Sequence, residues 1–196
     1  INDLWEYDVI RNNWTMKATA AAFGGPGQFR GAGFSTFNED SYVLGGDIGN
    51  CNVRNNFVKY SNGSWIAATA GPSARAYFQM HKEGAGLYLY GGGNEPWTSC
   101  SQAPSAEMWM YNGSWWNLPN KGTLIPPGKN AYASGLDLDE LKILIWGGNT
   151  GGARTDDLWV FDTETSKWTN PIPNGDPNSH SKRGYVASLA KMGSDW

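Results

Sequence analysis

Asp157-Leu158-Trp159-Val160-Phe161-Asp162, followed by Trp168, is the stretch that decides the fold, because the chain repeats it. Its counterparts are DLWEYD at residues 3–8, NFVKYS at 56–61 and EMWMYN at 107–112, which precede Trp14, Trp65 and Trp115. The copies recur about every fifty residues. A fixed period of this length is typical of stacked copies of one supersecondary unit that cannot bury its apolar faces alone. The sequence therefore predicts a repeat architecture built from strands.

Two further strands are predicted ahead of each aromatic one. The nearer is apolar throughout, which favours a strand covered on both faces, and it ends in paired glycines, which suit close backbone approach or positive φ. The more distant is opened by a basic residue. The glycine-ended stretches are 42–46, 87–92 and 143–148, and the basic residues are Arg30, Arg75, Lys129 and Arg183. The predicted unit is a basic-led strand a, a glycine-ended strand b lying innermost or nearly so, an aromatic strand c and a tryptophan strand d.

These motifs resemble the Kelch repeat of β-propellers over the whole chain, with Lys129 standing where arginine is usual. The resemblance implies an all-β, Kelch-type β-propeller, here a single segment of about four blades' worth. The expected divisions are a partial blade at 1–16, blades at about 30–66, 75–116 and 129–169, and a partial blade at 183–196. We expect an arc of a larger propeller; the alternative is that the terminal pieces combine into a fourth blade.

Composition argues against two classes of protein, nucleic-acid binders and membrane-spanning proteins. The net charge is −3 and only 17% of residues are charged, which argues against a nucleic-acid binder because such a protein needs a basic stripe. No apolar run approaches the roughly 18 residues of a membrane span. The 26 glycines and 11 tryptophans fit short strands joined by tight turns.

Catalytic chemistry is not predicted. His81 falls in the expected a–b turn at 80–84, and His180 falls in the d–a loop at 177–181, so the two lie on opposite faces of a four-stranded blade. Asp176 with His180 is a weak ligand pair, better interpreted as a solvated loop. Nucleophile and phosphate-binding motifs are absent from the sequence. We expect no enzyme, no catalytic residue, no metal and no cofactor.

Binding is expected on the face that carries the b–c and d–a loops, since long loops on a rigid scaffold concentrate binding residues. Trp97 lies outside the repeat pattern there, where it either anchors a partner or covers its own blade. The expected function is a non-catalytic interaction or structural module with a protein partner; the alternative is a carbohydrate-binding or carbohydrate-acting propeller. The candidate binding residues are Asp47, Arg54, Asn94, Glu95, Trp97, Arg154, His180 and Lys182.

Cys51 and Cys100 follow the glycine pairs of neighbouring blades, so a disulfide between them is predicted, with free buried thiols as the alternative. Asn13, Asn62 and Asn112 match the N-glycosylation pattern on expected c–d turns, although Asn-Gly is also the preferred hairpin turn. Together these features predict an extracellular or cell-surface protein, with the cytoplasm as the alternative.

Overall fold

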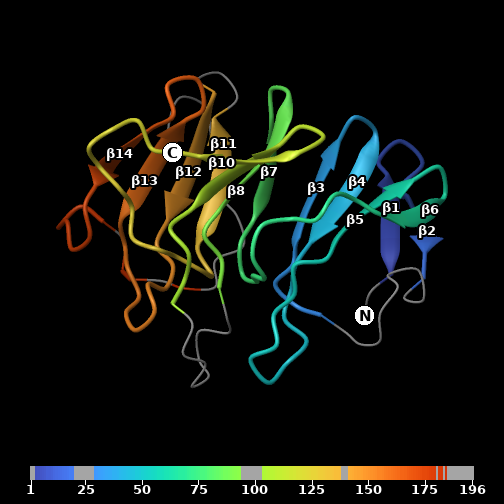
Figure 1. Cartoon of the computed structure of the whole chain (residues 1–196), viewed down its shortest axis with the longest axis horizontal. Coiled ribbons are helices and arrows are strands. Elements are labelled where there is room, and N and C mark those ends of the chain that lie inside the picture. Colours follow the sequence, from blue (N-terminus) through green and yellow to red (C-terminus); the bar gives the residue numbers. More distant parts are fainter. Residues whose placement is uncertain are drawn as a thin grey trace.

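The computed structural model describes residues 3–19, 29–93, 103–137, 141–179, 181–182 and 184. Over these residues the chain is all-β, without helix, and forms three four-stranded antiparallel sheets and one two-stranded sheet. The sheets stand side by side as blades (Figure 1). The predicted fold class, an arc of a Kelch-type propeller, is confirmed.

We number the blades I to IV along the chain. Blade I contains β1 (Leu4–Asp8) and β2 (Asn13–Ala18); blade II contains β3 (Gly33–Phe37), β4 (Asp40–Leu44), β5 (Phe57–Ser61) and β6 (Ser64–Ala67); blade III contains β7 (Met80–Glu83), β8 (Gly86–Tyr90), β9 (Met108–Tyr111) and β10 (Trp115–Leu118); blade IV contains β11 (Ala133–Asp137), β12 (Lys142–Trp146), β13 (Leu158–Asp162) and β14 (Lys167–Ile172). In each complete blade the strands follow the predicted order a, b, c, d.

Strand a lies at the inner end of each complete blade. The a strand β7 contacts both β3 and β11, the a strands of its neighbours. Strand b lies next to strand a. It is therefore not the innermost strand but the one beside it, which is one of the two positions that the sequence allowed. Its residues are buried as the continuous apolar runs predicted; Leu44, Leu87 and Ile145 have almost no exposed surface.

In blades II and III the paired glycines join the blade to the next one. The N–H of Gly46 donates to the Arg75 carbonyl at 2.9 Å, and the N–H of Gly92 donates to the Lys129 carbonyl at 2.8 Å. A Cβ on Gly91 would lie 2.3 Å from that same Lys129 oxygen, and φ of Gly91 is +66°. Close approach and positive φ both require glycine at this position.

Arg75 and Lys129 do not open their a strands, contrary to the prediction. They precede these strands and bind within their own blade. Arg75 is buried and donates to the Gly91 carbonyl at 2.8 Å and to Glu107 at 2.9 Å. Lys129 is buried and donates to the Gly147 carbonyl at 2.8 Å and to Asp157 at 2.7 Å. Each cation therefore ties the glycine end of strand b to the acidic start of strand c.

Arg30 does not belong to this set, and its predicted equivalence to Arg75 and Lys129 is wrong. Arg30 pairs with Asp47, the residue after the glycine pair, as Ala76 pairs with Gly93 and Asn130 with Asn149. The true counterpart of Arg75 is therefore Phe29, which packs on Gly46 as Arg75 packs on Gly92. The acidic partner is missing as well, because Asn56 occupies the place of Glu107 and Asp157. Blade II thus replaces both members of the charge pair with neutral residues.

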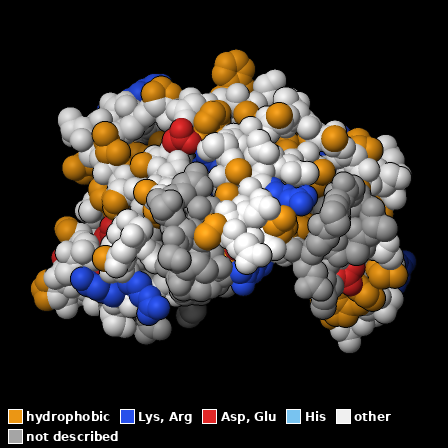
Figure 2. Space-filling view, turned by 60° about the horizontal axis from the view of Figure 1, so that its bottom comes forward, with side chains coloured by type: hydrophobic (Ala, Val, Ile, Leu, Met, Phe, Trp, Pro, Cys, Tyr) orange, Lys and Arg blue, Asp and Glu red, His pale blue; other side chains and the backbone are white. Residues whose placement is uncertain are grey.

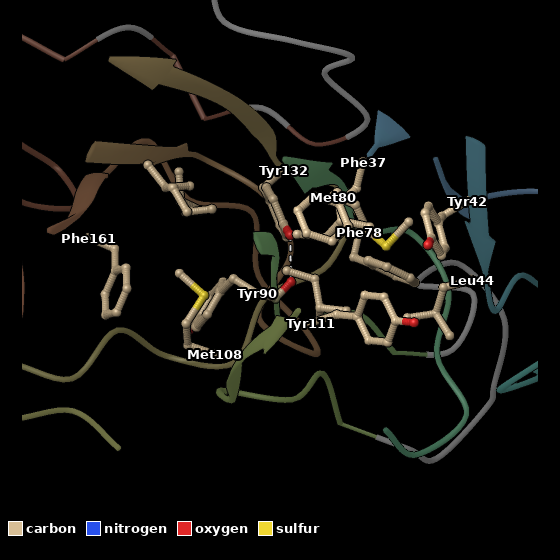
Figure 3. Close-up of a cluster of buried hydrophobic side chains, with 14 of the residues drawn as sticks. Phe37, Tyr42, Leu44, Phe78, Met80, Tyr90, Met108, Tyr111, Tyr132 and Phe161 are labelled. Carbon is tan, nitrogen blue, oxygen red and sulfur yellow. Dashed lines mark hydrogen bonds between the residues drawn. The ribbon is translucent and has the colours of Figure 1, made fainter. Parts of the chain in front are cut away.

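Aromatic rings fill the spaces between blades. The Trp115 ring of blade III lies 5.0 Å from the Phe57 ring of blade II, and the Trp168 ring of blade IV lies 5.0 Å from the Tyr90 ring of blade III. Figure 3 shows the buried rings gathered between the strands, with the Tyr132 hydroxyl donating to the Tyr90 carbonyl at 2.5 Å. Trp115 and Trp168 are therefore interface residues between blades, as their fixed positions predicted.

Candidate functional site

The b–c loops project from one edge of the arc. The 47–56 loop and the 149–157 loop extend beyond their strands at the bottom of Figure 1. Each is a small ordered hairpin. The Ile48 N–H donates to the Asn52 carbonyl at 3.1 Å, and the Thr150 N–H donates to the Ala153 carbonyl at 3.0 Å. We call the face formed by these loops and the d–a segments the loop face.

Asp47 anchors the first of these loops and does not face a partner, contrary to the prediction. Its side chain is fully buried, and it accepts hydrogen bonds from the Gly49 N–H at 2.7 Å and the Tyr77 hydroxyl at 3.0 Å. Tyr77 belongs to the next blade and holds a φ of +59°, in the left-handed region that an aromatic residue rarely occupies. The Asp47 carboxylate therefore fixes both its loop and the start of blade III.

Cations remain exposed on the loop face. Arg154 and Lys182 are exposed, and Arg54 is partly buried. Arg30, which the sequence did not predict as a binding residue, lies 3.4 Å from Asp47 with 52% of its side chain exposed. Figure 2 turns this face toward the viewer and shows lysine and arginine side chains in several patches, with few acidic ones.

A second buried carboxylate, Asp156, organises the other end of this face. It accepts hydrogen bonds from the Gly175 N–H at 2.8 Å and the Ser179 hydroxyl at 2.9 Å. The Gly175 hydrogen bond first, and Ser179 and the nearby Lys182 in addition, hold the pKa of the Asp156 carboxyl below its usual range. The side chain of Arg154 lies against Gly184 in the same d–a segment. The predicted residues Arg154 and Lys182 are thus brought to one region around Asp156.

Several predicted site residues lie outside the described residues. They are Asn94, Glu95, Trp97, His180 and Cys100. Cys51 is disulfide-bonded, and it sits in the first b–c loop with a φ of +60°. Its pairing with Cys100 stays a prediction.

His81 lies in β7 and not in the a–b turn where the sequence predicted it, because that turn contains only Gly84 and Ala85. Its Nε2 atom is 2.6 Å from the Ser134 hydroxyl of blade IV, and that hydroxyl donates to the Gln79 side chain at 2.8 Å. Burial lowers the pKa of His81 to about 4, so the ring is neutral at pH 7. This histidine joins two blades.

The three predicted glycosylation residues, Asn13, Asn62 and Asn112, are exposed. Asn62 and Gly63 both have positive φ, 49° and 80°, as a two-residue Asn-Gly hairpin requires. Asn112 differs, since its side-chain oxygen accepts a hydrogen bond from the Trp116 indole at 3.0 Å. The turn chemistry explains Asn62 without a glycan, and glycosylation stays a prediction.

Within the part of the chain that the structure describes, no group of three or more His, Cys, Asp or Glu side chains could hold a metal ion. Asp176, one half of the weak pair considered from the sequence, accepts the N–H of Asn178 at 2.7 Å and so closes a local turn. The same described residues include no helix long and apolar enough to cross a membrane.

One sequence signal sets the exposed Arg30 apart from Arg75 and Lys129, the absence of an acid at Asn56; the register of Arg30 itself is seen only in the structure. Gly31 follows it directly and has a φ of +64°, whereas the corresponding left-handed residues, Tyr77 and Ala131, come two residues after Arg75 and Lys129. That one-residue offset, together with the missing acid at Asn56, marks Arg30 as a loop-face residue.

Comparison with known proteins agrees with this architecture. Residues 31–194 match the KLHDC2/KLHL20/DRC7 Kelch-repeats domain. The chain is 24% identical to human "Host cell factor 2" over 89% of its own length and 24% of that protein. It is 23% identical to "Tip elongation aberrant protein 3" of Schizosaccharomyces pombe (strain 972 / ATCC 24843), over 86% of its own length and 13% of that protein. The chain thus spans a quarter or less of each of these relatives. Its radial blades, its glycine pairs bonded to the following blade and the matched domain together show that the chain belongs to the Kelch-repeat family.

Proposed function

We propose that the chain is a non-catalytic protein-interaction module that binds its partner through the loop face. The observation that carries this proposal is the division of charge on that face. Asp47 and Asp156 are buried and hydrogen-bonded, while Arg154 and Lys182 are exposed. Because these two acids are used to hold the loops, the exposed charges beside them are the cations of Arg154 and Lys182, although the whole chain is acidic.

This arrangement favours a partner segment that carries carboxylates. Arginine can bind a carboxylate through two parallel hydrogen bonds, which gives direction as well as attraction. The loops that present Arg54 and Arg154 are ordered hairpins, so little conformational entropy is lost when a partner binds. Trp97, the apolar anchor predicted on the same face, would add buried area to such a contact.

The buried titratable groups support a non-catalytic function, because each has a structural partner. Lys129 and Arg75 hold their blades together, and His81 bonds Ser134. Burial raises the pKa of the Tyr90 hydroxyl well above its usual value, and this hydroxyl donates to the Pro127 carbonyl at 2.7 Å. These perturbed groups are used in packing and need no substrate to explain them.

The test is a binding comparison with a random peptide library displayed on phage. We expect the selected peptides to be acidic, and the double variant Arg154→Ala/Lys182→Ala to bind them at least about tenfold more weakly. Arg11→Ala is the matched control, since it removes an exposed cation from a c–d turn on the opposite face and should leave affinity unchanged. Equal binding by the double variant would reject the loop face, and selective binding on a glycan array would favour the carbohydrate alternative.

The compartment of the protein stays a prediction, with the extracellular or cell-surface location and the cytoplasmic alternative both open. The oxidation state of Cys51 in protein isolated from its source under thiol-trapping conditions decides between them, because disulfides persist in oxidising compartments.

A further inference from the structure

The chain contains three Asn-Gly pairs, which are Asn62-Gly63, Asn112-Gly113 and Asn174-Gly175. An asparagine that precedes glycine is open to loss of its side-chain amide, because glycine has no Cβ to keep its backbone nitrogen away from the side-chain carbon of the asparagine. All of these residues are exposed, so water reaches each pair. The pairs differ in what holds the two groups that would react, the asparagine side chain and the glycine N–H.

Asn174-Gly175 is held at both groups. The Gly175 N–H donates to the Asp156 carboxylate at 2.8 Å, and the Asn174 side-chain oxygen accepts the Asp156 N–H at 3.3 Å. The nitrogen that would attack and the side chain that would be attacked are therefore each bound to Asp156. A reaction within this pair has to break both hydrogen bonds.

Asn112-Gly113 is held at the side chain only. The Asn112 side-chain oxygen accepts a hydrogen bond from the Trp116 indole at 3.0 Å. This pair also lies in a wider turn, because three residues separate Tyr111 from Trp115, its partner across β9 and β10. The bond to the indole restrains rotation of the Asn112 amide toward the Gly113 nitrogen.

Asn62-Gly63 has neither restraint. Among the residues that the structure describes, the Asn62 side chain and the Gly63 N–H have no hydrogen-bond partner. A Cβ on Gly63 would have nothing within 4 Å, so the turn is surrounded by open space. The two residues link Ser61 to Ser64, the pair that closes β5 and β6. They can therefore move without disturbing a buried contact.

We propose that Asn62 is a site of deamidation. The Gly63 nitrogen attacks the side-chain carbon of Asn62, so that a carbon–nitrogen bond forms while the bond from that carbon to the amide nitrogen breaks. Ammonia leaves with the proton of the Gly63 N–H, and the product is a cyclic succinimide. Water then opens the ring at either carbonyl and gives aspartate or isoaspartate. The reaction consumes only water and releases only ammonia.

The left-handed turn has to open before the ring can close. Asn62 and Gly63 have φ of 49° and 80°, and the Asn62 backbone must rotate for the Gly63 nitrogen to reach the side-chain carbon. Opening of an exposed two-residue turn costs far less free energy than global unfolding.

The product differs from asparagine in charge and, as isoaspartate, in backbone length. Both changes fall on a c–d turn, on the face opposite the loop face. Peptide binding through the loop face should therefore be the same before and after deamidation, and the two proposals fail independently.

The test follows the three pairs by mass spectrometry of peptides while the folded protein is kept at mildly alkaline pH. Water labelled with heavy oxygen marks the molecules that react during the incubation. Asn62 should convert at least about fivefold faster than Asn112 or Asn174, which is the rate equivalent of one neutral hydrogen bond. In urea that unfolds the chain, the three pairs should react at similar rates, because the contacts that distinguish them are gone.

Trp116→Phe is the matched variant. It keeps an aromatic ring at an exposed position and removes the indole N–H that holds Asn112. Conversion of Asn112 should become about fivefold faster in this variant, and conversion of Asn62 should stay the same.

Four outcomes would overturn the proposal. In the first, Asn62 converts no faster than Asn112 and Asn174 in the folded chain, which would mean that its turn protects it. In the second, Asn62 keeps its lead in urea, so that the folded contacts do not decide the rates. In the third, Trp116→Phe leaves the conversion of Asn112 unchanged or slows it. In the fourth, protein isolated from its source carries a glycan on Asn62, which would occupy the amide.

Discussion

Replacing Asp157 with asparagine should destabilise the chain strongly, because it leaves the ammonium of Lys129 buried without its carboxylate. That ammonium has no exposed surface, and it donates to Asp157 at 2.7 Å, Thr155 at 2.6 Å and the Gly147 carbonyl at 2.8 Å. The two remaining acceptors are neutral. Breaking a buried ion pair by removing one partner costs about 3–5 kcal/mol. The melting temperature should therefore fall by about 10 °C, at 2–4 °C per kcal/mol for a domain of this size.

The same chain indicates how the loss can be repaired. Blade II has Phe29 and Asn56 at the positions of the charge pair, and it folds as the same four-stranded sheet. Lys129→Phe alone should cost as much as Asp157→Asn, because it leaves a buried carboxylate with the Trp159 indole as its partner. The double variant removes both charges and should be destabilised by only about 1 kcal/mol, since a neutral pair of suitable shape has no unpaired charge to bury.

The assay is urea unfolding of the wild type, the two single variants and the double variant, read as a double-mutant cycle. Each single variant is expected to cost about 3–5 kcal/mol and the double variant about 1 kcal/mol, so the expected coupling is on the order of 5–9 kcal/mol in favour of the double variant. Burial lowers the pKa of Lys129. In Asp157→Asn the carboxylate that raises this pKa is gone, so Lys129 can lose its charge as pH rises toward 10. The difference in unfolding free energy between Asp157→Asn and the wild type should therefore become smaller as pH rises toward 10. Additive single effects, with a double variant less stable than either single one, would refute this account of the pair.

Three further predictions follow from particular contacts. Gly91→Ala should lower the free energy of unfolding by about 3 kcal/mol or more, because a Cβ would lie 2.3 Å from a carbonyl oxygen. Gly113→Ala, at an open turn, should lower it by about 1 kcal/mol, and urea unfolding compares the two variants. His81 has a folded pKa of about 4, below its usual 6.5, so between these pH values the unfolded chain binds a proton that the folded chain does not. The free energy of unfolding should therefore fall by at most about 3 kcal/mol as pH drops from 6.5 to 4. Replacing His81 with glutamine should remove this part of the pH dependence in thermal melts. Cys51 and Cys100 should resist alkylation in denaturant without reductant, and reduction should lower stability by about 3–4 kcal/mol; modification of both thiols in unreduced protein would exclude the bond.

The repeat itself could be predicted from the sequence because the residues that define it are in contact between neighbouring blades. Trp115 and Trp168 recur since each packs on a ring of the preceding blade, and Gly91 is fixed by the backbone of the next one. Such residues give strand type and order. They also explain why the strand content was predictable although the strands are only four to six residues long.

Exact positions in the a strands could not be predicted in the same way. β7 reads Met-His-Lys-Glu, without an apolar run to fix its ends, so His81 was assigned to a turn. Arg30 was assigned one position out of register because any basic residue ahead of a strand fits the pattern; only the pairing with Asp47 fixes its place. The role of Asp47 was equally hidden, since its bond to Tyr77 joins residues thirty positions apart. Loop geometry of this kind depends on contacts between blades and leaves no local signal.

The most direct test of the account is a hydrogen-exchange footprint of the chain bound to a peptide selected from the library. We predict protection of the 47–55, 149–156 and 173–182 segments, which carry Arg54, Arg154 and Lys182, and unchanged exchange at the Asn62 and Asn112 turns. Protection confined to those turns, with the loop segments unchanged, would contradict the assignment of binding to the loop face.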